Sequence, residues 1–307
     1  MKDLLDKKLV IVTGKGGVGK STVSLALGMA AADAGKRAIV CEVAAQEGLS
    51  RVFHRAKVGF NEVQLDDNLW GISIDPDESM REYVLLQLKV KAARDLLFRS
   101  RIFNYLAAAT PGLRELVTIG KIWELSQPNR KVKGGVGYDI VIVDAPATGH
   151  GVGFLQTPRT FANVARVGPI AAQAETLDAF ITNSKRTGVA IVSLPEEMPV
   201  NETAMLEGEI TDKVGASVDR IFMNALYPDR FSDEEAEQLD GALDGVDGPE
   251  RAAILDALRE HRRADCQGEQ LARLEEMTKT PVTSLPFLFQ PELGAPVVRE
   301  LANRIAA

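Results

Sequence analysis

The chain has 307 residues, of which 45% are hydrophobic, and a formal net charge of −7. This size suits one large α/β domain with insertions, and the acidic balance without a basic face excludes nucleic acid as a partner. No apolar run reaches membrane-spanning length, and the two distant cysteines, Cys41 and Cys266, exclude a disulfide framework and favour a cytoplasmic setting.

A glycine-rich loop follows the first predicted strand. The apolar run 8–13 predicts a buried parallel strand, and residues 21–32 predict a helix. The loop between them fits the phosphate-binding pattern G-x-x-x-x-G-K-[ST], whose glycines let consecutive N–H groups face phosphate oxygens. Lys20 is expected to reach the β- and γ-phosphates of a nucleoside triphosphate, and Ser21 is expected to bind Mg²⁺. The predicted nucleotide-binding residues of the loop are Gly14, Lys15, Gly16, Gly17, Val18, Gly19, Lys20, Ser21 and Thr22.

Strands and helices follow one another along the rest of the chain. Further strands are expected at 37–43, 70–74, 138–144, 188–193, 281–285 and in an apolar run that ends at Met223-Asn224. Helices are expected at 78–127 with a break at 110–112, at 161–180, at 232–280 with a capping signal at Ser232 and a glycine break at 241–248, and at 295–306. These elements predict an α/β fold with a mostly parallel central sheet and helices on both faces.

The strand 138–144 ends in a carboxylate, Asp144. An Asp at this position can hold a water on Mg²⁺ and so partner the serine of the phosphate loop. The alternative is an ordinary turn residue at a strand end. The phosphate loop earlier in the chain favours the metal interpretation.

Several segments resemble one family in the same order along the chain. The loop with its extra lysine, Lys15, resembles the deviant Walker A motif of the MinD/ParA/nitrogenase-iron-protein superclass. Residues 144–158 resemble switch II of the arsenical-pump ATPases and of the tail-anchored-protein targeting ATPases. Residues 194–203, the pair Met223-Asn224 and residues 284–287 are similar to further segments of that family.

This resemblance implies an ATPase that works as a dimer with two ATP molecules between its subunits. Lys15 would then reach the partner's phosphates and act like an arginine finger. The implied catalytic residues are Lys15, Lys20 and Asp144. Asn224 would contact adenine, and the loop that contains Pro286 and Phe287 would cover it.

One position departs from the family pattern. Alignment places Ala44 where the family has the switch I Asp that orients the attacking water, and alanine cannot orient or accept a proton. Either Glu42 or Glu47 replaces that Asp, or the chain hydrolyses ATP weakly, or a paralogous subunit supplies the carboxylate in a heterodimer. A different register of this short alignment is a further alternative.

The chain is expected to form one ATPase domain with helical insertions at about 78–127, 157–187 and 232–280. In the targeting family, helices near the first two positions form a groove for a hydrophobic protein client. The alternative is that both stretches are ordinary core helices, which apolar helices usually are.

Charged segments outside the loop are expected at the surface. The basic run 130–135 is interpreted as a solvated loop, and His54 and His261 as surface residues. No metal cluster other than nucleotide-bound Mg²⁺ is expected from the three histidines, of which His150 lies in switch II.

Three functions remain open on these observations. The first is a homodimeric ATP-driven switch, and the second is a weakly hydrolytic or non-hydrolytic ATP-binding subunit of a heterodimer. The third is a positioning ATPase of the MinD/ParA type, which needs an amphipathic membrane tail or a basic DNA-binding face. The short C-terminal segment 297–305 has mixed charge and indicates neither.

Overall fold

The computed structural model describes residues 2–43, 48–54, 58–87, 110, 112–130, 135, 137–146, 148–165 and 168–306. An eight-stranded sheet with the order β3-β4-β2-β5-β1-β6-β7-β8 lies at its centre. All neighbouring strands are parallel except β3, which is antiparallel to β4. The strands are β1 (Leu9–Gly14), β2 (Ala38–Val43), β3 (Val63–Asp66), β4 (Leu69–Ile74), β5 (Ile140–Asp144), β6 (Thr187–Ser193), β7 (Val218–Leu226) and β8 (Val282–Pro286). The predicted α/β fold with a mostly parallel sheet is confirmed.

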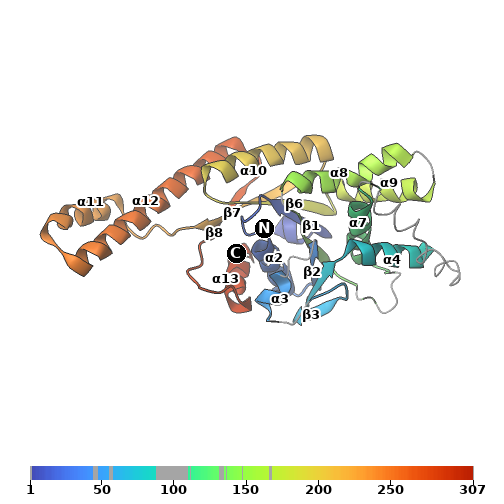
Figure 1. Cartoon of the computed structure of the whole chain (residues 1–307), viewed down its shortest axis with the longest axis horizontal. Coiled ribbons are helices and arrows are strands. Elements are labelled where there is room, and N and C mark those ends of the chain that lie inside the picture. Colours follow the sequence, from blue (N-terminus) through green and yellow to red (C-terminus); the bar gives the residue numbers. More distant parts are fainter. Residues whose placement is uncertain are drawn as a thin grey trace.

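Helices cover both faces of this sheet (Figure 1). The described helices are α1 (Lys2–Leu5), α2 (Lys20–Asp33), α3 (Gly48–Val52), α4 (Pro76–Gln87), α7 (Leu113–Leu125), α8 (Thr148–Ala165), α9 (Pro169–Ile181), α10 (Glu197–Glu209) with a π-helical extension (Ile210–Val214), α11 (Asp233–Ala242) with a 3₁₀ turn (Leu243–Gly245), α12 (Gly248–Met277) and α13 (Ala295–Ala306). No helix in these ranges is both long enough and apolar enough to cross a membrane.

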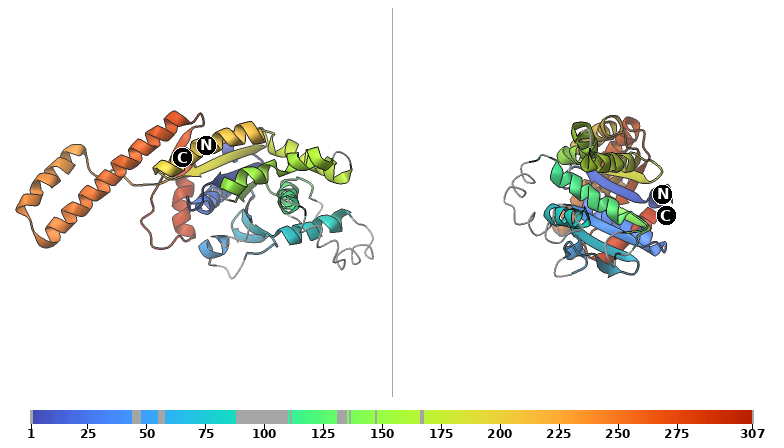
Figure 2. Two further views of the ribbon diagram at one scale, coloured as in Figure 1. Left: turned by 45° about the horizontal axis from the view of Figure 1, so that its top comes forward. Right: turned by 90° about the vertical axis from the view of Figure 1, so that its right-hand side faces the viewer.

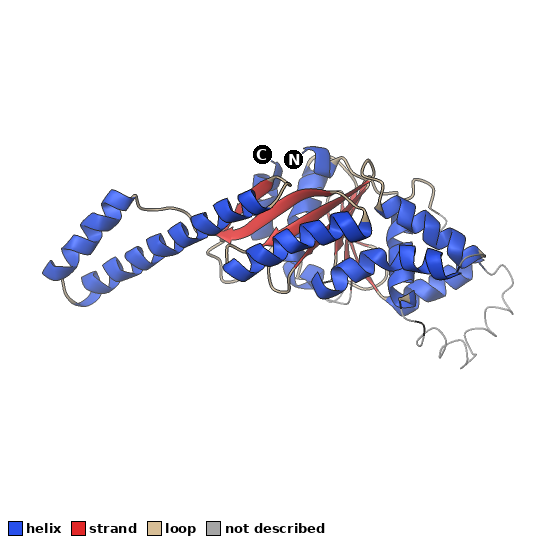
Figure 3. Cartoon of the chain, turned by 90° about the horizontal axis from the view of Figure 1, so that it is seen from above, coloured by secondary structure: helices blue, strands red, loops and turns tan. Residues whose placement is uncertain are grey.

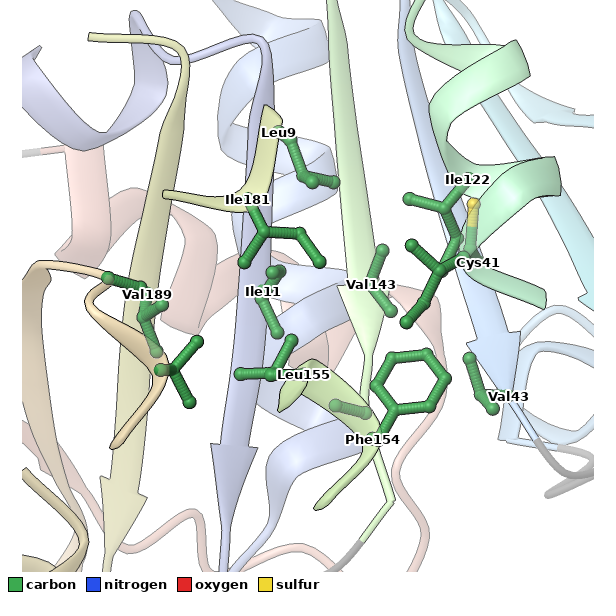
Figure 4. Packing of buried hydrophobic residues seen from close by; sticks show 14 of the residues in the cluster. Leu9, Ile11, Cys41, Val43, Ile122, Val143, Phe154, Leu155, Ile181 and Val189 are labelled. Carbon is green, nitrogen blue, oxygen red and sulfur yellow. The ribbon is translucent and has the colours of Figure 1, made fainter. Parts of the chain in front are cut away.

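The central strands contribute side chains to two separate cores. On β1, Leu9 and Ile11 belong to the core that α7, α8 and α9 cover, whereas Val10 and Val12 belong to the core that α2 and α13 cover. Figure 4 shows the first core, where Phe154 of α8 lies against the sheet. Because both faces of these strands are buried, each strand appears in the sequence as a continuous apolar run.

The edge strand β3 was not predicted. Only Leu65 among its four residues is buried, so its apolar pattern is short. The turn after it is the signal in the sequence, since Asn68 adopts a φ of 55° and asparagine tolerates this left-handed conformation.

A pair of helices, α11 and α12, projects from the sheet as an arm (Figure 1; Figure 2, left; Figure 3). The capping signal at its start is confirmed. Ser232 Oγ accepts a hydrogen bond from the Glu235 N–H, and the Glu235 carboxylate accepts one from the Ser232 N–H. We call α11 and α12 together the arm.

The predicted helix at 161–180 is two helices. Helix α8 ends at Ala165, and α9 begins at Pro169 after Gly168, whose φ is 104°. Proline is favoured in the first turn of a helix, so the Gly168-Pro169 pair marks the start of a new one. In the predicted tract 78–127, the structure has α4 and α7, and residues 88–109 lie outside the described residues.

Candidate functional site

The phosphate loop connects the end of β1 to the start of α2, in the middle of the sheet. Strands β5 and β6 flank β1, so the loop lies at the carboxyl edge of the parallel strands, where ligands of such sheets bind. Gly19 is the N-cap of α2, and the first turn of this helix carries no acidic residue. The loop therefore presents a positive helix N-terminus and exposed N–H groups, which suit an anion.

Two glycines of the loop have no room for a side chain. A Cβ on Gly14 would lie 2.3 Å from the Val192 carbonyl oxygen, and a Cβ on Gly19 would lie 2.3 Å from Asn224 Nδ2. The φ angles are 145° and 93°, a region that residues with a Cβ rarely adopt. The ends of β6 and β7 thus hold the loop closely from one side.

Asn224, which we predicted to contact adenine, lies against the loop. Its Nδ2 donates a hydrogen bond to the Val18 carbonyl oxygen at 3.0 Å. The predicted adenine loop leaves the sheet at the same edge, because Leu226 of β7 is opposite Pro286 of β8. Phe287 follows, half-exposed, and stacks on Tyr227 with ring centroids 4.9 Å apart. The stacked rings of Tyr227 and Phe287 therefore form an aromatic surface close to Asn224. The sequence motifs did not predict this stacking.

The charged side chains of the loop and of β5 converge. Ser21 Oγ donates to Asp144 Oδ2 at 2.5 Å, and Lys20 Nζ donates to the Lys15 carbonyl oxygen at 2.7 Å. Burial lowers the pKa of Lys20, and the nearby Asp144 partly opposes this. Burial raises the pKa of Asp144, against the opposing effects of the Ser21 hydrogen bond and of Lys20.

The oxygens of Ser21 and Asp144 fit a magnesium ion. Asp144 is 1% exposed, and its Oδ1 atom is buried without a hydrogen-bond partner among the described residues. A carboxylate and a hydroxyl are the hard oxygen donors that Mg²⁺ prefers, together with phosphate oxygens. A cation here would compensate the buried charge of Asp144, because an opposite charge favours the ionised carboxylate.

Lys15 lies at the outside of the loop and pairs within its own chain. Its Nζ atom lies 2.7 Å from Oε1 of Glu202 on α10, and about a third of each side chain is exposed. Glu202 Oε2 is buried and has no hydrogen-bond partner in the described ranges. The sequence did not predict this pair, although Glu202 lies in the segment 194–203 that resembles the family.

The predicted switch I region is described only in part. Ala44 and Glu47 lie outside the described residues. Glu42 lies beside Asp144 in the register of β2 and β5, and its Oε1 accepts a hydrogen bond from the Leu49 N–H at 2.7 Å. This bond engages the buried Glu42 carboxylate at the start of α3. The side chain of His150 also lies outside the described residues.

Arg130, which we expected in a solvated loop, is buried instead. Its side chain is 2% exposed and lies 2.6 Å from Glu62 and 2.8 Å from Glu124. The Tyr138 hydroxyl also donates to Glu62, at 2.6 Å. Burial alone would raise the pKa of Glu62, but the hydrogen bonds from Arg130 and Tyr138 outweigh it and hold this pKa below its usual value. The prediction failed because Glu62 lies far from Arg130 in sequence.

Beside this ionic cluster lies a cavity of about 700 Å³ between α4, α7 and α9. Leu116, Trp123 and Leu177 form part of its apolar wall. Lys121 lies at the charged end, where its Nζ is 2.8 Å from Glu82 Oε1. An apolar cavity with a few polar groups is the usual form of a binding pocket.

The two remaining histidine predictions have different outcomes. His54 is exposed, as expected. His261 on α12 is only 8% exposed and lies next to Asp233 and Asp265, so the prediction of a surface residue is wrong. The donor atoms of these three residues lie within 4.8 Å of one another, a grouping that the expectation of no second metal-ligating cluster did not anticipate.

Comparison with known proteins gives a consistent assignment. The model of the anion-transporting ATPase family matches residues 7–169, more than half of the chain. ATPase BagA of Mycobacterium tuberculosis is 27% identical over 304 residues, which is 95% of this chain and 88% of that protein. A provisionally named arsenical pump-driving ATPase of Halobacterium salinarum is 24% identical over 313 residues, 96% of this chain and 44% of that protein. ATPase GET3 of Podospora anserina is 29% identical over 163 residues, 52% of this chain and 46% of that protein. With the phosphate loop and the mostly parallel sheet, this match shows that the chain belongs to the anion-transporting ATPase family.

Proposed function

We propose that this chain binds Mg·ATP in the phosphate loop and uses its hydrolysis to drive a dimeric switch. The observation that carries the proposal is the convergence of Lys20, Ser21 and Asp144 at the carboxyl edge of the sheet. The chain forms one ATPase domain, and the helices within 78–127, 157–187 and 232–280 are insertions into it.

The loop residues have separate roles in this proposal. Residues 14–22 surround the phosphates with N–H groups, and Lys20 contacts the β- and γ-phosphates. Ser21 and Asp144 hold Mg²⁺, which neutralises charge on the phosphate oxygens when it is bound. Asn224 faces adenine from the loop side, and Pro286 and Phe287 cover it.

Lys15 connects nucleotide binding to dimer formation. No phosphate loop acting within one subunit requires this second lysine, and its position at the loop surface suits a contact with the partner's phosphates. The ion pair with Glu202 must break before Lys15 reaches across. A pair with a third of each side chain exposed contributes little, about 0–1 kcal/mol, so ATP and the partner subunit are able to displace it.

Ala44 supports a second candidate, a weakly hydrolytic subunit of a heterodimer with a paralogous ATPase. Without a positioned carboxylate, turnover falls by about 10²–10⁴. The Leu49 N–H donates a hydrogen bond to Oε1 of Glu42, which engages this oxygen in local structure. This contact favours the weak-hydrolysis alternative over replacement by Glu42. Glu47 stays a candidate for the replacement.

The cavity between α4, α7 and α9 is the proposed contact for a hydrophobic protein client. Its walls are mainly apolar and it lies on the same insertions as the client helices of the targeting ATPases. A positioning function of the MinD/ParA type is less well supported. The apolar residues Val298, Leu301 and Ile305 of α13 are buried in the core with α2, which leaves this face unavailable to a membrane.

Steady-state turnover and sedimentation of the purified chain test the switch. Lys15→Ala should keep ATP binding but reduce both turnover and ATP-dependent dimer formation. Lys213→Ala is the matched control, because Lys213 also pairs with a glutamate at the surface but lies far from the loop in sequence. Wild-type turnover and sedimentation of Lys15→Ala with ATP would contradict the cross-dimer role. Turnover that appears only after a paralogous subunit is added would establish the heterodimer.

A further inference from the structure

Three potential metal ligands meet where the two helices of the arm pack together. Asp233 lies in the first turn of α11, and His261 and Asp265 lie on α12. Because His261 and Asp265 are four residues apart on a helix, their side chains share one face. One donor atom from each of the three residues lies within 4.8 Å of the other two.

The distances fit a metal centre better than direct hydrogen bonds. His261 Nε2 lies 3.5 Å from Asp233 Oδ1 and 3.3 Å from Asp265 Oδ2. A charge-assisted N–H···O bond is shorter, about 2.7–2.9 Å. Ligands that surround zinc tetrahedrally at ~2.0–2.1 Å lie ~3.3–3.4 Å from one another. The distances from the imidazole nitrogen to each of the two carboxylates are therefore like those between ligands of one ion.

The burial of His261 beside the two carboxylates supports a common ligand. Only 9% of its side chain is exposed, its Nδ1 has no hydrogen-bond partner among the described residues, and its Nε2 faces both carboxylates. In the described ranges, neither Asp233 nor Asp265 forms an ion pair with lysine or arginine. Two close carboxylates repel each other, and a bound cation removes this repulsion.

We infer that Asp233, His261 and Asp265 form a site for a divalent transition-metal ion of the zinc class. The imidazole ligand favours such an ion over Mg²⁺ or Ca²⁺, which prefer oxygen ligands alone. Both carboxylates are reached by solvent, so water completes the coordination. The ion joins the first turn of α11 to α12 and stiffens the arm, away from the phosphate loop (Figure 1).

Equilibrium dialysis against Zn²⁺ with metal analysis tests this inference. The experiment uses the full chain without a histidine tag, in excess Mg²⁺ so that sites made of oxygen ligands are already occupied. The Cys266→Ser substitution removes the exposed thiol next to Asp265. We expect about one Zn²⁺ per chain. Asp233→Asn and Asp265→Asn should each weaken binding by about tenfold or more, because even partners outside the coordination shell contribute ~10–100-fold. Both side chains are exposed, so we expect the amide variants to fold.

His54→Ala is the matched control, since it removes an exposed histidine outside the arm and should leave Zn²⁺ binding unchanged. Hydrogen exchange gives a second measurement. Zn²⁺ should slow exchange of α11 amides in the wild type but not in Asp265→Asn. If the Cys266→Ser chain binds no Zn²⁺, or if Asp265→Asn binds it as tightly as the parent, the inference is wrong.

Discussion

At the scale of single residues, the cluster of Glu62, Arg130 and Tyr138 shows how burial changes the role of a charge. Arg130 is enclosed by carboxylates of Glu62 and Glu124, although its neighbours in sequence suggested a solvated loop. A buried ion pair contributes little net stability compared with apolar residues, but removing one partner leaves an uncompensated charge. Glu62 is therefore the residue at which a small change should have a large effect.

Glu62→Gln should lower the free energy of unfolding by about 1–3 kcal/mol at neutral pH, because it removes one of the two carboxylates that compensate Arg130 and leaves Glu124 in place. In the wild type, the lowered pKa of Glu62 stabilises the native state above the unfolded value of 4.5. This contribution disappears as the pH falls from that value through the lower native pKa. Urea unfolding across the acid range should show a smaller loss of stability for Glu62→Gln than for the wild type.

Glu78→Gln is the control for this measurement. Glu78 pairs with Arg81 at the surface, so the substitution should change stability by about 1 kcal/mol or less. Equal stability of Glu62→Gln and wild type at neutral pH would show that the ion pair between Glu62 and Arg130 does not stabilise the fold.

At the scale of elements, continuous apolar runs predicted most of the sheet, and a capping motif predicted the start of α11. The runs at 8–13 and 138–144 correspond to β1 and β5, whose side chains are buried on both faces. Strand β3 was missed because only Leu65 is buried in it. The break between α8 and α9 was missed because both helices are apolar and their pattern continues across it, although the Gly168-Pro169 pair is a signal for a new helix start.

Helix α13 provides a test at this scale. Leu301 is 2% exposed and packs with the core that includes α2, so Leu301→Ala should lower the free energy of unfolding by ~2–5 kcal/mol. Glu300→Ala, an exposed change in the same helix, should have an effect within ~0.5 kcal/mol. Chemical denaturation measures both. A Leu301→Ala variant as stable as the wild type would mean that α13 is not part of the core in solution.

At the scale of the whole molecule, the phosphate loop could be predicted because its residues are consecutive. Its contacts could not, since they join distant segments: Lys15 pairs with Glu202, and Asn224 bonds to Val18. The same reason explains the buried His261, whose neighbour Asp233 lies on another helix. Local pattern predicts elements and contiguous motifs, whereas side-chain partners depend on how the sheet brings separate segments together.

The most direct test of the account is calorimetric titration of Mg·ATP into the wild-type chain and into Lys20→Ala. The account predicts that the wild type binds Mg·ATP and that Lys20→Ala loses most of this affinity, because Lys20 is assigned to the β- and γ-phosphates. Lys213→Ala, with its lysine removed at an exposed position of the π-helical turn, should bind like the wild type. Unchanged Mg·ATP affinity in Lys20→Ala would contradict the assignment of the nucleotide to this loop.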